Sequence, residues 1–317
     1  MQKETFFQTM RDGAQVSVIR WIPDCDSKDI RGLFQISHGM VDHASRYEVL
    51  AQFMTENGYV CSAHDHRGHG KTGEKAQNEN KGKLGFLAEK DGFTAVVEDL
   101  REVIEKLKKD YPEKEIILFA HSFGSFVGQA FIEKYGNIIQ KCVLCGTAFP
   151  SAKLIYTGLF LVGTAKKLFG AKECAPFVNM LFFKMNNKKI KEPSSPHSWI
   201  SKDEEEVKKY DRDPFCNFMP TLGFFYDLLW GLNFVRKQKN INSIPCTMPI
   251  LFISGEDDPV GLYSSAVKKL YKIYKASGKI NASIKIYKGC RHELINEINR
   301  SDVFGDLLFW IKAGEVK

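Results

Sequence analysis

The chain has 317 residues, of which 44% are hydrophobic and 26% are charged, values close to the averages for soluble globular proteins. This composition excludes a disordered chain, a fibrous repeat and a small disulfide-linked scaffold. The 45 basic and 38 acidic residues give a net charge of +7 that is spread along the chain, which indicates solubility and argues against a nucleic-acid partner.

No segment reaches the ~18–20 uncharged apolar residues that a membrane span requires, so we expect no transmembrane helix. Residues 1–5 lack the basic-then-apolar order of a secretory signal, which favours a cytoplasmic location. The eight cysteines are scattered, and Cys142 and Cys145 lie in an apolar run that predicts a buried strand, not a zinc or redox site. The lysine-rich residues 184–191 are interpreted as a solvated loop, with transient contact to a membrane surface as the alternative.

In chain order, short apolar runs predict eight strands, at residues 4–10, 14–21, 32–37, 59–63, 115–120, 140–145, 250–254 and 282–287. Helical periodicity predicts helices at residues 45–57, 91–110 and 122–135 and after each of the last two strands. Alternating strands and helices indicate an α/β fold with a mostly parallel sheet covered on both faces.

This alternation is lost between residues 150 and 243, which we interpret as an inserted helical cap on a core formed by residues 1–149 and 244–317. The cap is rich in aromatic residues, among them Phe182, Phe183, Phe224, Phe225, Tyr226 and Trp230. They either form the core of the cap or line an acyl-binding tunnel, and the sequence leaves both open.

Ser122 follows an apolar strand and opens a predicted helix, with the small residues Ala120 and Gly124 on either side. This is the context of a nucleophile elbow, in which small neighbours let the serine adopt strained dihedral angles. Glycine normally stands at the position of Ala120, and alanine is small enough to be tolerated there. A helix N-cap would explain Ser122 but not both small neighbours.

A serine nucleophile requires a base and an acid later in the chain. His292 follows the last strand and a glycine turn, and it completes the order serine, acid, histidine. Three adjacent acids, Glu256, Asp257 and Asp258, follow the preceding strand, and position alone favours Asp258 while leaving its neighbours open.

The backbone N–H groups of Met40 and Phe123 are the predicted oxyanion donors, because Gly39 lets the backbone approach a tetrahedral oxygen after an early strand. His38, Gly39, His121 and Gly124 are expected to support the site. His38, His43 and His64 are interpreted as histidines that brace loops, and none of the three is assigned a proton transfer. Residues 65–70 are dense in His and Asp, but no second ligand cluster accompanies them in the sequence, so a structural role is favoured over a metal site. We expect no metal and no organic cofactor.

Five segments occur in the order found in one family: residues 38–47, 65–70, 120–124, 255–260 and 292–293. Through them the chain resembles the α/β-hydrolases of the monoacylglycerol lipase and lysophospholipase group, often catalogued with serine aminopeptidases. The resemblance implies an α/β-hydrolase fold and a triad of Ser122, Asp258 and His292, with the spacing from Gly255 selecting Asp258. It covers nearly the whole chain and is weakest at residues 151–243, where residues 199–203 and 210–214 are similar to the cap of lysophospholipase-like members.

The resemblance implies acyl transfer to water. The implied substrate is an ester of an aliphatic acyl chain, such as a monoacylglycerol, a lysophospholipid or a short-chain carboxylic ester. An aminopeptidase or amidase on the same triad is the alternative, for which the acidic residues 203–206 could bind a free amino terminus, although a helix start explains them as well. A non-catalytic binding protein is a remote alternative, because such proteins usually lack a triad residue. A dehalogenase or epoxide hydrolase would require Asp in place of Ser122. The oligomeric state is left open.

Overall fold

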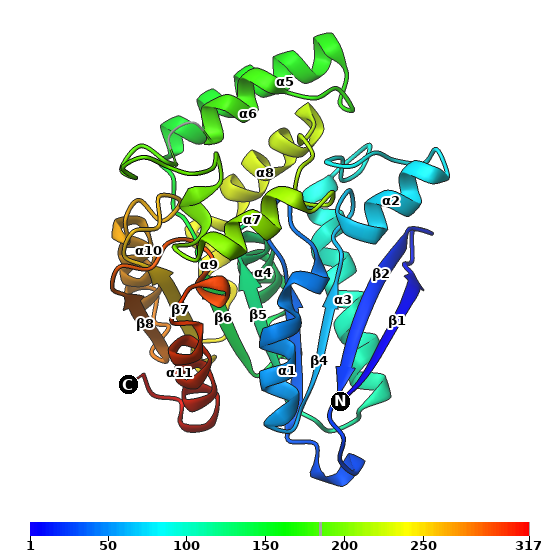
Figure 1. Ribbon diagram of the computed structural model, residues 1–317, viewed down its shortest axis with the longest axis vertical. Helices are drawn as coiled ribbons and strands as arrows, with labels where there is room; N and C mark the ends of the chain where they lie inside the picture. The colour runs from blue at the N-terminus through cyan, green and yellow to red at the C-terminus, as the bar shows by residue number, and fades with distance from the viewer. Residues whose placement is uncertain (184–185, 317) are drawn as a thin grey trace.

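The computed structural model describes residues 1–183 and 186–316, without the side chains of residues 181–183. Within these residues, eight strands form one sheet in the order β1-β2-β4-β3-β5-β6-β7-β8 (Figure 1). The strands are β1 (Gln2–Thr9), β2 (Gln15–Ile22), β3 (Gly32–Ser37), β4 (Tyr59–His64), β5 (Ile116–His121), β6 (Lys141–Cys145), β7 (Ile250–Gly255) and β8 (Ala282–Tyr287). The predicted eight strands are confirmed.

Among the described strands of this sheet, the β1–β2 and β2–β4 pairs are antiparallel. The remaining pairs, from β4 across to β8, are parallel. The central strands β3, β4, β5 and β7 are buried along their whole length, which explains their continuous apolar sequences. The edge strand β1 alternates between exposed and half-buried residues. Cys142 and Cys145 are free thiols buried in β6, as the prediction of a buried strand required.

Eleven α-helices are formed by the described residues: α1 (Glu48–Glu56), α2 (Gly70–Asn78), α3 (Gly92–Asp110), α4 (Phe123–Tyr135), α5 (Ala152–Phe169), α6 (Pro176–Phe183), α7 (Glu204–Arg212), α8 (Leu222–Val235), α9 (Gln238–Ser243), α10 (Ser265–Ala276) and α11 (Arg300–Ala313). The sequence analysis missed α2, because its polar sequence carries no apolar periodicity. None of the helices in the described residues is long and apolar enough to span a bilayer.

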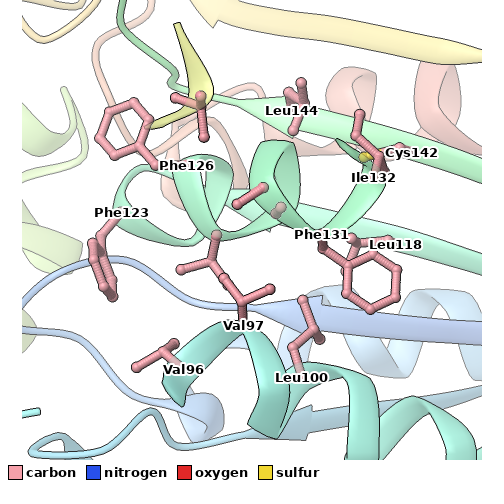
Figure 2. Packing of buried hydrophobic residues seen from close by; sticks show 14 of the residues in the cluster. Val96, Val97, Leu100, Leu118, Phe123, Phe126, Phe131, Ile132, Cys142 and Leu144 are labelled. Atoms are coloured by element: carbon pink, nitrogen blue, oxygen red, sulfur yellow. The ribbon is translucent and has the colours of Figure 1, made fainter. Parts of the chain in front are cut away.

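Separate hydrophobic cores cover the two faces of the sheet. One face is covered by α3, α4 and α10, and the other by α1 and α11. Figure 2 shows the first core, where α3 and α4 meet through side chains that include Val96, Val97, Phe123 and Phe131. Because α4 is packed on both sides, its first turn, which follows Ser122, is held rigidly at the end of β5.

Helices α5 to α9 fall within the segment expected to form a cap. In Figure 1, α8 lies between the sheet and α5, and α8 contacts α3, α4 and α5. Phe224 and Phe225 of α8 are fully buried in the first core, whereas Tyr226 is half-buried and Trp230 is 37% exposed. The side chains of Phe182 and Phe183 lie outside the described residues, as do Lys184 and Met185 of the lysine-rich segment.

Candidate active site

Ser122 stands between β5 and α4 with a positive φ of 52° and a ψ of −119°. Its N–H donates to the carbonyl of Cys145 at 2.9 Å, and its own carbonyl accepts from the N–H of Ser125 at 2.8 Å. These two hydrogen bonds hold a backbone conformation that a non-glycine residue rarely adopts. Ser122 is half-buried, whereas the residues on either side of it, His121 and Phe123, are buried.

Close packing explains why the residues around Ser122 are small, and the neighbouring atoms differ from one position to the next. A Cβ on Gly124 would lie 2.2 Å from the carbonyl oxygen of Ser37, because the first turn of α4 packs against the end of β3. A Cβ on Gly128 would lie 2.7 Å from the Cβ of Ala120. Gly128 therefore provides the space that lets alanine occupy the elbow position where glycine is usual.

The pair of Ala120 and Gly128 leads to a stability prediction. Gly128→Ala should destabilise the fold by about 1–3 kcal/mol and reduce turnover, because the added methyl group displaces the turn that carries Ser122. The double variant Ala120→Gly with Gly128→Ala should recover most of both losses. Urea unfolding and ester hydrolysis measure these effects.

Gly305→Ala in α11 is the matched control, since nothing lies within 4 Å of the Cβ added there. It should leave stability unchanged or raise it by up to about 1 kcal/mol. A double variant no more stable than Gly128→Ala would show that the two residues do not compensate each other.

His292 and Asp258 form a fully buried pair after β8 and β7. Nδ1 of His292 lies 3.0 Å from Oδ1 of Asp258, and that oxygen also accepts from the N–H of Val260 at 2.9 Å. Nε2 of His292 has no hydrogen-bond partner among the described residues. Burial acts to lower the pKa of His292, but the negative charge of Asp258 and its hydrogen bond outweigh it and raise the pKa above its ordinary value.

The three adjacent acids have different surroundings. Asp258 is 0% exposed and faces His292, whereas the Asp257 side chain is 48% exposed and pairs with Lys202 at 3.1 Å. The carboxylate of Glu256 is exposed and accepts from the N–H of Gly289 at 3.2 Å. The structure thus brings Asp258, and neither neighbour, to the imidazole.

The loop after β3 lies directly against Ser122. A Cβ on Gly39 would lie 3.4 Å from the Cβ of Ser122 and 3.3 Å from Nδ1 of His121. Met40 is half-buried next to this approach, and Phe123 is buried on the other side of Ser122. The two backbone segments predicted to bind the oxyanion are therefore brought together beside the serine.

A buried ion-pair network connects this loop to the residue after His292, and the sequence analysis assigned it no role. Arg46 binds both carboxylate oxygens of Glu293, at 2.9 and 2.6 Å, and Oδ1 of Asp42 at 2.9 Å. Oδ2 of Asp42 accepts from the N–H of Gly39 and from the Tyr47 hydroxyl. The signal that could have revealed it was the presence of Arg46, Tyr47 and Glu293 inside the motifs that carry the family resemblance.

His121 lies between these groups. Its Nδ1 is 3.1 Å from the Tyr47 hydroxyl and its ring is 4.9 Å from the ring of His292. Burial lowers the pKa of His121 to about 4, so this ring is neutral at physiological pH. A neutral, hydrogen-bonded His121 fits a supporting role beside the catalytic candidates.

A short segment before α7 covers the imidazole of His292. The Trp199 ring is centred 5.1 Å from the His292 ring. The Arg291 guanidinium donates to the carbonyls of Ser198 and Ser201, and the N–H of Glu293 donates to the carbonyl of Ile200 at 2.7 Å. Trp199 therefore shields the histidine from water on one side.

The dense block at residues 65–70 is occupied with internal hydrogen bonds. The Asp65 carboxylate accepts from the N–H groups of Ala44 and Lys71, and Nε2 of His38 accepts from the N–H of His66 at 2.9 Å. Burial lowers the pKa of His69 to about 4. These contacts fit the bracing role expected for the block and for His38.

Known proteins similar to this chain point to one family. A family model described as serine aminopeptidase, S33, matches residues 28–299. The monoacylglycerol lipase of Mycolicibacterium smegmatis is 28% identical over 299 residues, which cover 94% of this chain and 93% of the relative. The monoglyceride lipase of Homo sapiens is 25% identical over 305 residues, covering 95% and 88%.

Among solved structures, a highly thermostable carboxyl esterase from Bacillus coagulans in complex with glycerol matches with a TM-score of 0.88 and 25% identity, covering 98% of both chains. Together with the observed sheet, this neighbour confirms the expected α/β-hydrolase fold. Because the family model spans well over half of the sequence, the chain belongs to the serine aminopeptidase S33 family of α/β-hydrolases.

Proposed function

We propose that this protein is a serine hydrolase that cleaves carboxylic esters of lipids, with a monoacylglycerol or lysophospholipid as the substrate class. The observation that carries the proposal is the buried pair of His292 and Asp258, which leaves Nε2 of His292 without a partner among the described residues. The His292 ring lies 4.9 Å from the ring of His121, the residue that directly precedes the strained Ser122. A base fixed in this way activates a serine hydroxyl for attack on an acyl carbon.

The proposed reaction has two steps. Nε2 of His292 takes the proton of the Ser122 hydroxyl as Oγ attacks the ester carbonyl, and the N–H groups of Met40 and Phe123 stabilise the oxyanion. The imidazolium then gives its proton to the leaving alcohol, and an acyl-enzyme remains. Water, deprotonated by His292, attacks the acyl group and releases the carboxylic acid and Ser122.

Two observations support an ester over an amide substrate. The relatives reported above are named monoacylglycerol or monoglyceride lipase, and the solved neighbour is a carboxyl esterase. Three of the four acids that could bind a free amino terminus have other partners. Asp203 caps α7 through backbone N–H groups, Glu205 pairs with Lys208, and Glu206 pairs with Arg300. We therefore keep the aminopeptidase only as an outcome of the test below.

The test is the initial hydrolysis rate on one panel, with Ser122→Ala as the blank. The panel holds nitrophenyl esters of increasing chain length, a monoacylglycerol, a lysophospholipid and an aminoacyl amide. We expect ester turnover with a chain-length optimum and at least about 10³-fold less in Ser122→Ala. Turnover of the amide alone would establish a peptidase, and equal rates in the variant would remove Ser122 from the mechanism.

An exposed apolar face on α5 supports delivery of the substrate from a membrane surface. The large hydrophobic residues that are more than half exposed on this helix are Leu154, Tyr156, Phe160, Leu161, Leu168 and Phe169. The same helix carries Lys153, Lys166 and Lys167 and no acidic residue. Apolar and basic side chains together fit the interface of an anionic bilayer, which this proposal takes as the occupant.

Phe160→Ser with Leu168→Ser should weaken binding to vesicles of phosphatidylglycerol and phosphatidylcholine by about tenfold or more, because two large side chains no longer enter the bilayer. Hydrolysis of a water-soluble short-chain ester should stay unchanged. Ile280→Ser, in the turn before β8 and also exposed, is the matched control and should bind as the wild type does. Equal binding of all three proteins in a sedimentation assay would contradict the proposal.

The proposal also covers the domain boundaries and the cellular location. We take residues 150–243 as a cap over a core of residues 1–149 and 244–317, which the position of α8 between the sheet and α5 supports. We place the protein in the cytoplasm, which its eight free cysteines support because thiols persist in a reducing compartment.

A further inference from the structure

Three side chains outside the triad bring three kinds of metal-ligating atom together. They are His43, Asp213 and Cys216, whose ligand atoms all lie within 4.8 Å of one another. Nε2 of His43 lies 2.9 Å from Oδ2 of Asp213. The mechanism proposed above uses none of these side chains.

The three residues come from two distant parts of the chain. His43 ends the loop after β3 that carries Gly39 and Met40, whereas Asp213 and Cys216 follow α7 in the proposed cap. The histidine and the aspartate are 170 residues apart. An ion bound here would therefore join the oxyanion loop to the cap segment.

Each ligand is already held in place by a second contact. Nδ1 of His43 lies 2.7 Å from the Ser45 hydroxyl, and Oδ1 of Asp213 accepts from the N–H of Phe215 at 2.8 Å. The N–H of Cys216 donates to the carbonyl of Asp213 at 3.0 Å. If Ser45 accepts the Nδ1 proton, Nε2 is left as a ligand, which is the usual outer-shell arrangement of a metal-bound histidine.

The site is enclosed but reachable. Cys216 is 1% exposed and His43 is 8% exposed, while the Asp213 side chain is 27% exposed and gives access from solvent. The nearby charges favour a cation: Arg46 is offset by Asp42 and Glu293, and Asp213 adds a further negative charge.

We propose that His43, Asp213 and Cys216 form a binding site for a zinc-class divalent ion that links the oxyanion loop to the cap. One nitrogen, one oxygen and one sulfur ligand suit zinc, whereas calcium and magnesium prefer oxygen alone. On binding, the contact between His43 and Asp213 opens to admit the ion, and the thiol of Cys216 loses its proton to solvent as the metal–sulfur bond forms. Water occupies the fourth position.

Binding has a consequence for the reaction that rests on the proposed function. His43 is three residues from Met40, and its N–H donates to Oδ1 of Asp42, whose other oxygen holds the N–H of Gly39. Fixing His43 to the cap segment therefore constrains the loop that must accommodate the oxyanion. We expect bound zinc to lower kcat for ester hydrolysis more than it changes KM.

The test uses the purified full chain freed of metal, titrated with Co²⁺ and followed by thiolate-to-cobalt charge-transfer absorption, with calorimetric titration of Zn²⁺ in parallel. We expect saturation at one ion per chain, and loss of the absorption band in Cys216→Ser. Asp213→Asn should weaken binding by roughly 10–100-fold. Cys174→Ser, which removes an exposed cysteine, is the matched control and should bind as the wild type does.

Circular dichroism of each variant checks that it is folded. A band retained in Cys216→Ser, or the absence of saturable binding by the wild type, would overturn the proposal. The absorption readout does not depend on turnover, so the metal site and the proposed ester hydrolysis can fail separately. Zinc binding that leaves kcat unchanged would overturn the link to the oxyanion loop.

Discussion

Asp258→Asn is expected to lower kcat/KM for ester hydrolysis by about 10⁴-fold. The carboxylate that faces Nδ1 of His292 at 3.0 Å holds the imidazole in the tautomer that leaves Nε2 able to accept a proton. An amide at this position can donate to Nδ1 instead, which places the proton on Nε2 and removes the base. Initial rates on a soluble ester, with the protein shown to be folded, measure the loss.

Asp257→Asn is the matched control for this prediction. It changes the same functional group one residue earlier, on an exposed side chain that pairs with Lys202. We expect less than about a twofold change in rate, because surface substitutions away from a site have small effects. If the two variants exchanged these outcomes, the acid of the triad would be Asp257.

The pH profile gives a second readout of the same variant. His292 acts as a base only when neutral, so activity falls as the pH drops through its pKa, which Asp258 raises above the ordinary 6.5. In Asp258→Asn the charge is gone and burial alone remains, so the pKa of His292 falls. The acidic limb of the residual kcat/KM profile should therefore move to lower pH, and a limb that stays in place would contradict this account.

Arg46→Met is expected to destabilise the fold by about 3–5 kcal/mol and to reduce kcat at temperatures where the variant remains folded. Removing the guanidinium leaves the buried carboxylates of Asp42 and Glu293 without their counter-ion. Burial raises the pKa of the Glu293 carboxyl, but the charge of Arg46 and its hydrogen bonds outweigh this and lower it. Denaturant unfolding measures the first effect, and separate kcat and KM values measure the second.

Positioning by Arg46 can be distinguished from simple stabilisation. Arg101→Met is the matched control, because Arg101 of α3 also bridges two acids, but these acids, Glu98 and Glu105, are 28% and 39% exposed. Arg101→Met should lower the free energy of unfolding by less than about 1 kcal/mol and leave kcat unchanged. Arg46→Lys should recover part of the stability but less of kcat, since lysine cannot bind Glu293 through two parallel hydrogen bonds. An unchanged kcat in folded Arg46→Met would show that the network serves stability alone.

The amino-acid sequence by itself determined the architecture, because periodicity and turn residues are local properties. Apolar runs located all eight strands and the helix after Ser122, and the parallel sheet then required the loops after β3, β5, β7 and β8 to meet at one edge. The small residues beside Ser122 marked the elbow for the same local reason. The helix α2 was missed because its polar sequence depends on tertiary contacts rather than on amphipathic periodicity.

The tertiary structure alone decided which side chains meet. Asp257 and Asp258 are adjacent in sequence, yet their side chains have different surroundings. Asp257 forms an exposed ion pair with Lys202, whereas Asp258 is buried against His292. Arg46 and Glu293 are 247 residues apart, so no local pattern pairs them. Ala120 is tolerated at the elbow because Gly128, in the second turn of α4, leaves space for the methyl group of Ala120. Such contacts depend on the distances between packed helices and strands, and these distances cannot be predicted from a local sequence pattern.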